Sequence, residues 1–229
     1  MTGPGPTPDP APDPDLLLAL LADARLPVGA HTQSAGLEPA VAHGGLALAD
    51  VPEFLHGRLR TVVAVEAGTA VVARHHVLAG LPPGPVEDAW AARTPSPPLR
   101  AASRTLGRGY LRMAGRVWPH PVWAALGRTP PRPLVLGALA AVAGLDAARL
   151  VRLCVHDDAA TVGAAALKLL PTDPVDTVAW TVAAHRAGEG LVADLAHLTD
   201  PDDVPAPGAP LTEEFSLLHT TTPMRLFHA

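Results

Sequence analysis

The 229-residue chain has no isoleucine, no asparagine, one lysine and one cysteine, and aromatic residues make up only 3 % of it. Leucine, valine and alanine must therefore build the core, and a hydrophobic content of 48 % is enough to bury one. The lone Lys168 is followed by Leu169 without a preceding glycine loop, which excludes a Walker-A nucleotide site. We interpret the compositional skew itself as the mark of a GC-rich genome.

The sequence also predicts neither a membrane-spanning helix nor a signal peptide. The longest nearly uninterrupted apolar stretch, residues 134–145, is shorter than the roughly 20 residues that cross a bilayer. The amino-terminal residues are acidic and proline-rich, unlike a signal peptide. A single cysteine, Cys154, cannot form an internal disulfide. Together these features predict a cytoplasmic protein without a membrane span.

Composition and apolar spacing predict three parts. Residues 1–14 contain six prolines and are expected to form a disordered tail. Residues 15–210 are predicted to form one all-α domain, a bundle of about eight to ten helices, because apolar residues recur at three- and four-residue steps. Residues 211–229 offer few capping residues, so we expect this carboxyl-terminal tail to bind a partner and to order on it.

Caps and helix breakers give the expected helix boundaries. Asp15, Asp50 and Asp146 are predicted caps, and Glu53 stands where it could complete a capping box. The predicted helices cover a short segment after Asp15, residues 35–43, a long helix from 50 towards 80, a short helix around Trp90, and residues 99–117, 134–143, 146–170, 174–187 and 189–198.

The strongest charge feature is an acid-free block, residues 89–145, which contains eight of the sixteen arginines. Five of them repeat every four residues and would form a stripe along one helix: Arg100, Arg104, Arg108, Arg112 and Arg116. The stripe suits an acidic partner surface, and equally a solvated face that pairs with acids of the same fold. A nucleic-acid interface is the weaker hypothesis, because the chain carries a net charge of −5 and few stacking aromatics.

Enzyme chemistry is the minority hypothesis. Glu66 lies near an apolar helix face and could act as a buried acid or base, although an ion pair with an arginine is the commoner role. Ser34 lacks the first glycine and the preceding strand of a nucleophile elbow. A metal-dependent helical enzyme using histidines and Glu66 stays open as an alternative.

Eleven histidines raise the question of a metal site. The most plausible ligand groups, suited to nickel or copper, are His75 with His76, and Cys154 with His156, Asp157 and Asp158. A closed zinc site usually has two separated ligand pairs, and one cysteine excludes a cysteine-rich framework. Packing or surface exposure is therefore the favoured interpretation, with Cys154 an inert buried thiol.

Four segments form a recognisable series. Residues 16–38 contain an apolar helix, a Leu-Pro-x-Gly-Ala turn and the sequence Ser-x-Gly-Leu-Glu. Residues 102–108 carry arginines around a glycine, residues 166–171 read basic-Leu-x-Pro, and His219 precedes Arg-Leu-Phe at 225–227. In this order and spacing the segments resemble UreF-type urease accessory proteins, and the likeness covers residues 16–229.

The resemblance implies a non-catalytic helical homodimer that helps to assemble the nickel centre of urease. Such proteins join a second accessory protein, UreD/UreH, and recruit the GTPase UreG to apo-urease. No stably bound cofactor is implied, although nickel could pass through the complex. The residues that we predict to bind partners are Gly29, Ala30, His31, Ser34, Gly36, Glu38, Arg104, Arg108, Lys168, His219, Arg225 and Phe227.

Some positions depart from the family pattern and indicate a divergent member. They are His31 in place of an aromatic residue, Pro174 in place of glutamine, Thr220 in place of glutamate and Ala229 in place of serine. Within the opening motif, Gly29 and Gly36 are expected to allow tight turns. Ser34 is expected to cap the following helix, and Glu38 to lie at its positive end. Arg225 and Phe227 are residue types that interfaces favour as anchors.

Overall fold

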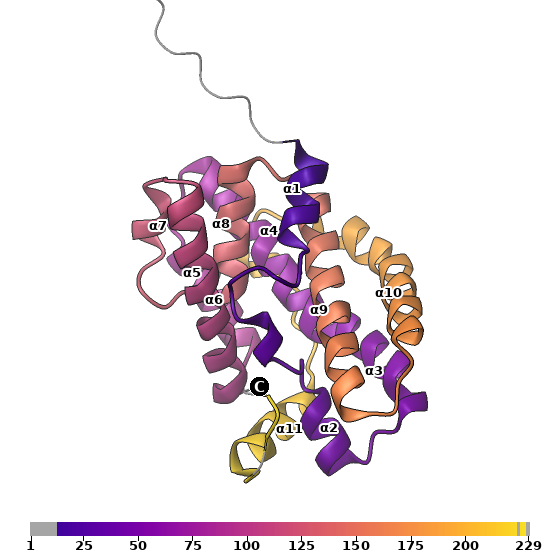
Figure 1. The fold of residues 1–229 in the computed structure, drawn as a ribbon. Helices are drawn as coiled ribbons and strands as arrows, with labels where there is room; N and C mark the ends of the chain where they lie inside the picture. The colour runs from indigo at the N-terminus through magenta and orange to yellow at the C-terminus, as the bar shows by residue number, and fades with distance from the viewer. Residues whose placement is uncertain (1–12, 224, 228–229) are drawn as a thin grey trace, which may run out of the picture.

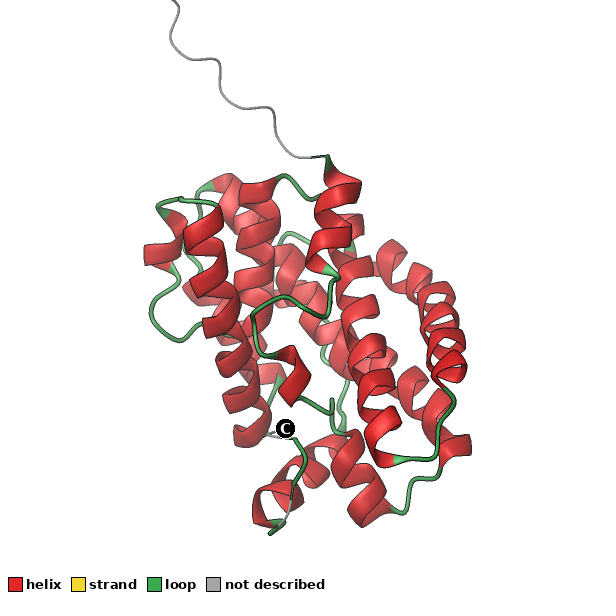
Figure 2. Cartoon of the chain, viewed as in Figure 1, coloured by secondary structure: helices red, strands yellow, loops and turns green. Residues whose placement is uncertain are grey.

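The computed structural model describes residues 13–223 and 225–227, and every regular element in these ranges is a helix (Figures 1 and 2). The predicted all-α class is therefore confirmed. α3 and α4 continue into one another through a π-helical segment, η3, which gives a helix number within the expected range. The elements are α1 (Pro14–Leu21), η1 (Ala30–Thr32), α2 (Leu37–Gly44), η2 (Leu48–Asp50), α3 (Val51–Arg58), η3 (Leu59–Val63), α4 (Ala64–Ala79), α5 (Gly84–Arg93), α6 (Pro97–Val117), α7 (Val122–Ala125), α8 (Arg132–Ala143), α9 (Ala147–Leu169), α10 (Pro174–Leu195), η4 (Pro201–Asp203) and α11 (Pro210–Thr221).

α4 is the central helix of the bundle. It packs most extensively against α8 and also against α9. α6 lies on the outer side of α8, and α10 lies on the outer side of α9 (Figure 1). At the lower end in that view, α11 packs on α2 and on the start of α6, and the chain ends beside them.

The core consists mainly of leucine, valine and alanine, as the composition predicts, with Trp90, Tyr110 and Phe227 as buried aromatic additions. Such small side chains fill little space, so the helices must approach closely. Gly137 of α8 shows how closely: a Cβ built there would lie 2.2 Å from the carbonyl oxygen of Ala70 and 2.7 Å from the Cβ of Ala73. The missing side chain at Gly137 lets α8 lie directly on α4.

By length and composition alone, the continuous helix over 48–79 could cross a membrane. It is the one such helix in the ranges that the structure describes. Most of its α4 portion is nevertheless buried, and α5, α8 and α9 all pack on it. This burial is typical of the core helix of a bundle, and the apolar stretch 134–145 likewise forms buried α8 and its cap.

Several predicted caps differ in the structure. Asp13, not Asp15, caps α1, because its Oδ1 accepts hydrogen bonds from the backbone N–H of residues 15 and 16. Pro14 therefore belongs to α1, and the rest of the expected disordered tail, residues 1–12, lies outside the described residues. Asp50 accepts from the N–H of Ala47 at 2.9 Å and so caps η2 instead of α3. The cap at Asp146 is confirmed, and Asp173 caps α10 by accepting a hydrogen bond from the backbone N–H of Val175.

One predicted boundary is also wrong. The predicted break between residues 187 and 189 does not occur, and α10 continues to Leu195. A Cβ at Gly188 would lie 2.8 Å from Cγ1 of Val155, so this glycine serves close packing of α10 on α9 instead of ending a helix. The carboxyl-terminal tail was expected to order on a partner, but residues 210–221 fold as α11 on their own chain.

We expect Gly137→Ala to lower the free energy of unfolding by about 1–3 kcal/mol, because the new methyl group must push α8 away from α4. Urea titration followed by circular dichroism measures the change. Gly190→Ala is the matched control, since a Cβ at Gly190 meets no atom within 4 Å and alanine favours helix. Equal stability of the two variants would contradict the close packing described above.

Candidate functional site

The opening motif positions Glu38 through two turns. Gly29 and Gly36 have φ values of +88° and +80°, a left-handed conformation that glycine adopts without strain, as predicted. Gly36 itself occupies the cap position of α2, so the expected side-chain cap from Ser34 is wrong. Ser34 is fully buried, and its carbonyl oxygen accepts a hydrogen bond from the N–H of Leu37 at 3.0 Å. Glu38 follows in the first turn, as expected.

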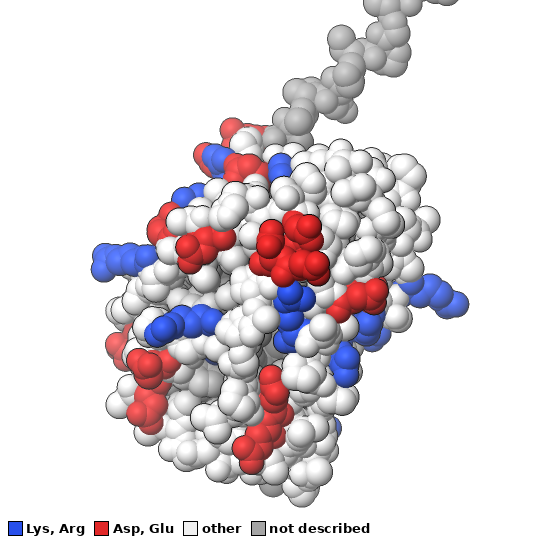
Figure 3. All heavy atoms as spheres, turned by 180° about the vertical axis from the view of Figure 1, so that it is seen from behind, with Lys and Arg blue, Asp and Glu red and all other residues white. Residues whose placement is uncertain are grey.

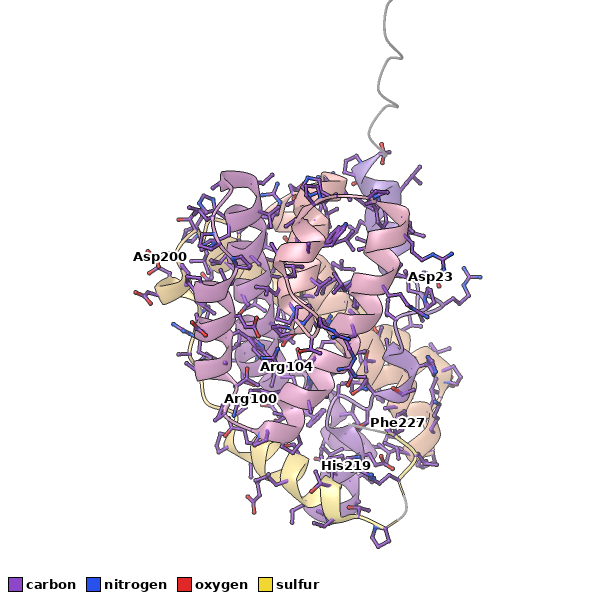
Figure 4. All side chains as sticks on the ribbon, turned by 90° about the vertical axis from the view of Figure 1, so that its left-hand side faces the viewer. Asp23, Arg100, Arg104, Asp200, His219 and Phe227 are labelled. Carbon is purple, nitrogen blue, oxygen red and sulfur yellow. The ribbon has the colours of Figure 1, made fainter. Side chains whose placement is uncertain are left out.

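Glu38 is buried and binds the end of the chain, which the sequence did not predict. Its Oε1 accepts a hydrogen bond from the backbone N–H of Leu226 at 2.7 Å, and its Oε2 accepts one from Phe227 at 3.1 Å. Nε2 of His219 lies 3.5 Å from the same carboxylate. The amino-terminal and carboxyl-terminal motifs therefore meet through one side chain. Figure 4 shows His219 and Phe227 close together at this end of the molecule.

The third motif contributes Lys168, whose Nζ lies 4.9 Å from the centre of the Phe227 ring, within the range of a cation–π contact. Phe227 itself is buried, with 4 % of its surface exposed. Nη1 of Arg225 stands 3.5 Å from the carbonyl oxygen of His219. We call this group the carboxyl-terminal junction; its residues are Gly36, Glu38, Lys168, His219, Arg225 and Phe227.

α11 connects the junction to neighbouring helices. The Ser216 and Ser96 hydroxyls lie 2.6 Å apart, and Nε2 of His43 lies 2.9 Å from the Thr222 hydroxyl. Four leucines of α11 and of the segment after it are more than a third exposed: Leu211, Leu217, Leu218 and Leu226. Between α2, α6 and α11 lies a cavity of about 340 Å³ that His219 and Arg225 help to line.

The predicted partner residues of α6 do not reach the junction. Arg104 pairs with Glu87 at 2.7 Å, and its guanidinium lies 5.6 Å from the Trp90 ring. Three other stripe arginines bond to nearby oxygens of their own chain: Arg100 to the Pro95 carbonyl, Arg108 to the Thr105 hydroxyl and Arg112 to the Pro27 carbonyl. These contacts favour a solvated face, and a partner role for Arg104 and Arg108 stays a prediction. Figure 4 shows Arg100 and Arg104 on α6.

Gly29, Ala30 and His31 also lie outside the junction. They lead into and form the start of η1, where His31 is exposed. On the opposite face from the view of Figure 1, acidic and basic side chains alternate with broad uncharged areas (Figure 3). The basic side chains on that face are scattered and form no broad patch of the kind that a nucleic-acid backbone would need.

A buried network of charges holds α4, α8 and α9 together. Arg132 of α8 contacts Glu66 at 3.2 Å and also pairs with Asp157. Burial raises the pKa of Glu66, while the charge of Arg132 and a hydrogen bond from the Trp90 indole oppose that rise. The ion-pair interpretation of Glu66 is therefore confirmed.

A second buried pair was missed by the sequence reasoning. Arg58 of α3 binds Asp158 of α9, with 3.0 Å between Nε and Oδ2. Asp157 and Asp158, considered above as metal ligands, thus bind arginines. The sequence does contain one sign that Arg58 is buried, because Arg58 lies between Leu55 and Leu59 along the helix.

The predicted metal groups do not converge. Nδ1 of His76 contacts the Pro82 carbonyl oxygen, and the ring of His75 stands edge-on to that of His76, with 6.3 Å between their centres. In the described ranges no three histidine, cysteine, aspartate or glutamate side chains are arranged to hold an ion. Cys154 is 2 % exposed, and burial raises the pKa of its thiol to about 12, so the predicted inert thiol is confirmed.

Comparison with known proteins agrees with this arrangement. The UreF family model matches residues 47–186. A urease accessory protein UreF of Mycobacterium sp. (strain JLS) is 38 % identical over 197 residues, covering 80 % of this chain and 88 % of that protein. The corresponding proteins of Mycobacterium marinum and Mycobacterium tuberculosis are 37 % identical over 191 residues and 38 % over 197, each covering 81 % of this chain and 89 % of the relative.

These relatives define the class as urease accessory proteins, which are non-catalytic chaperones and not enzymes. The chain belongs to the UreF family. The resemblance drawn from four separate motifs is thereby confirmed, and the metal-dependent enzyme is set aside.

We expect Cys154 to resist alkylation in the native protein at about pH 8, where an ordinary thiol with a pKa near 8.5 is partly ionised and reacts. The raised pKa and burial of Cys154 remove both thiolate and access. Mass spectrometry after iodoacetamide treatment, with and without denaturant, measures the difference. Rapid labelling of the folded chain would contradict the burial of this thiol.

We expect Glu38→Gln to release the chain end, because an amide replaces the carboxylate that accepts two backbone hydrogen bonds. Charge-assisted bonds of this kind are each worth about 1.5–3 kcal/mol, so amide exchange at residues 226 and 227 should accelerate by about tenfold or more. Hydrogen–deuterium exchange detects this. Glu53→Gln, at an exposed side chain of α3, is the control. Unchanged exchange in Glu38→Gln would refute the role of Glu38.

Proposed function

We propose that this protein acts with UreD/UreH and the GTPase UreG to promote nickel insertion into apo-urease in the cytoplasm. In this role it is a non-catalytic homodimeric chaperone that recruits or regulates the GTPase, and nickel passes through the assembly without being held as a resident cofactor. Membership of the UreF family supports the pathway. The absence of a Walker-A sequence fits a protein that relies on another chain for nucleotide hydrolysis.

The observation that carries the proposal is the anchoring of the carboxyl-terminal segment by Glu38. This anchoring fixes α11 on the body of the protein and leaves the four exposed leucines of this segment, which we call the α11 face, in place before any partner binds. Leu217 and Leu226 on that face are 51 % and 69 % exposed. Exposed apolar side chains on an ordered scaffold suit protein–protein recognition, because little ordering entropy is lost when the partner binds.

We assign this face to the UreD/UreH partner. Deleting residues 211–229 would also uncover α2 and would confuse lost binding with lost folding, so surface substitutions test the assignment more sharply. We expect the double variant Leu217→Asp, Leu226→Asp to weaken binding of UreD/UreH by about tenfold or more, since charges replace apolar contacts. Co-purification and titration of the purified partner measure binding, and activation of apo-urease by nickel and GTP measures function.

Val178→Asp is the matched control, because Val178 is an equally exposed valine, at 61 %, on α10. Both variants should keep the circular dichroism and unfolding midpoint of the parent protein. Full partner binding by the double variant, or equal loss in Val178→Asp, would overturn the assignment of the α11 face.

A further inference from the structure

The cavity between α2, α6 and α11 has a polar but almost uncharged lining. Its volume of about 340 Å³ falls within the roughly 300–1,000 Å³ that small-molecule sites occupy. Among the described residues that line it, none is acidic and only Arg225 is permanently charged. Five of the lining residues carry hydroxyl groups: Thr32, Thr105, Thr212, Ser216 and Thr220.

Most of these hydroxyls have already used their hydrogen atom. Four donate it to a backbone carbonyl oxygen three or four residues earlier, at 2.6–3.0 Å: Thr32, Thr105, Ser216 and Thr220. A hydroxyl that donates in this way has only lone pairs left to offer a ligand. The side-chain nitrogen of Gln33 likewise donates to the Thr32 hydroxyl at 3.3 Å, which leaves the amide oxygen of Gln33 as an acceptor. The walls are therefore rich in acceptors.

His219 adds a buried acceptor to the same cavity. Its side chain lines the cavity, and the residue is 4 % exposed. Nε2 lies 3.5 Å from the Glu38 carboxylate and 3.4 Å from the carbonyl oxygen of Phe227. Because both neighbours are acceptors, we assign the hydrogen of the neutral ring to Nε2, which makes Nδ1 an acceptor. In the described part of the chain Nδ1 has no hydrogen-bond partner. A buried polar atom of this kind calls for a donor.

Arg225 supplies the strong donor at this cavity. Its side chain is exposed, and Nη1 reaches the carbonyl oxygen of His219 only at 3.5 Å. A guanidinium held this loosely can turn towards a ligand, to which it offers N–H groups and no acceptor. The cavity thus requires a ligand that donates to several acceptors and accepts from one arginine.

We propose that this cavity binds a primary carboxamide, whose carbonyl oxygen accepts from Arg225 and whose NH₂ group donates to Nδ1 of His219 and to the hydroxyls of the wall. A carboxamide has two N–H donors and one carbonyl acceptor, which complement the lining. A carboxylate has no donor and would meet lone pairs everywhere except at Arg225. An ammonium group would meet Arg225 as a like charge, with no acidic side chain in the described lining to neutralise it.

A small free amide and the glutamine side chain of another protein present the same chemistry, so the test uses probes for both. The ¹⁵N-labelled full-length chain is titrated with propionamide and with N-acetylglutamine methylamide, and their matched acids, propionate and N-acetylglutamate methylamide, are the controls. We expect the two amides to give saturable NMR shifts at residues 105, 216 and 220. The acids should bind about tenfold or more weakly, because a site built for a donor rejects an analogue that lacks it.

The pattern of binding distinguishes the two sources. Tighter binding of propionamide assigns the cavity to free amides, and tighter binding of the glutamine probe assigns it to a protein side chain. Absence of saturable shifts with both amides, or equal affinity for amides and acids, would overturn the proposal.

Three variants locate the binding in this cavity. Ala102→Leu fills it without changing a polar group, Arg225→Gln removes the guanidinium, and His219→Phe keeps a ring without nitrogen. Each should weaken amide binding by about tenfold or more. Arg116→Gln is the control, because Arg116 is an exposed arginine of α6 outside the lining. Circular dichroism checks the fold of each variant.

Unchanged affinity in Ala102→Leu or Arg225→Gln, or an equal loss in Arg116→Gln, would contradict the site. The leucines of the α11 face lie outside the lining. The inference is therefore independent of the proposed function, and its failure would leave the UreD/UreH assignment unaffected.

Discussion

Close helix packing through small residues is the constraint on which the rest of the structure depends. A core made of alanine, valine and leucine is compact only when helix axes come near one another. Gly137 against Ala70 provides this between α8 and α4, and Gly188 against Val155 provides it between α10 and α9. The composition of the chain thus has a structural consequence, whatever genomic bias produced it.

Closely packed helices leave little room for water, so charges inside the bundle must satisfy one another. Arg132 bridges Glu66 of α4 and Asp157 of α9, and Arg58 binds Asp158. Shifting one helix against another would separate these partners and leave an uncompensated buried charge. The pairs therefore disfavour other registers of the helices. The acid-free block of the sequence therefore supplies arginines to two places: Arg132 lies inside the bundle, and the five arginines of the stripe lie along α6.

The sequence predicts most of the helices, but it does not predict which residues make the contacts between them. Apolar period and caps such as Asp146 are local, and they located most of the helices. The role of Gly188 could not be predicted, because a glycine that ends a helix and one that packs against a neighbour look alike without the partner helix. The same holds for Glu38: a carboxylate at a helix start has a sufficient local explanation, and only the folded chain brings Phe227 to it.

The junction gives a physical reason for three of the four motifs, which lie far apart in sequence: the opening motif, the segment at Lys168 and the carboxyl-terminal segment. The backbone N–H groups of Leu226 and Phe227 need acceptors once the segment folds back, and Glu38 supplies both oxygens from α2. Phe227 then needs a covered face, which Lys168 provides from the end of α9. Gly36 contributes through its left-handed φ of +80°, and a Cβ built there would lie 3.8 Å from both Nη1 of Arg58 and Cγ2 of Thr212, so the start of α2 lies between the interior ion pair and α11. A change in any of these motifs would reach the surface of α11 through direct contacts. The motifs and the docking surface thus form one connected structure, which is built from α2, α9 and the carboxyl-terminal segment.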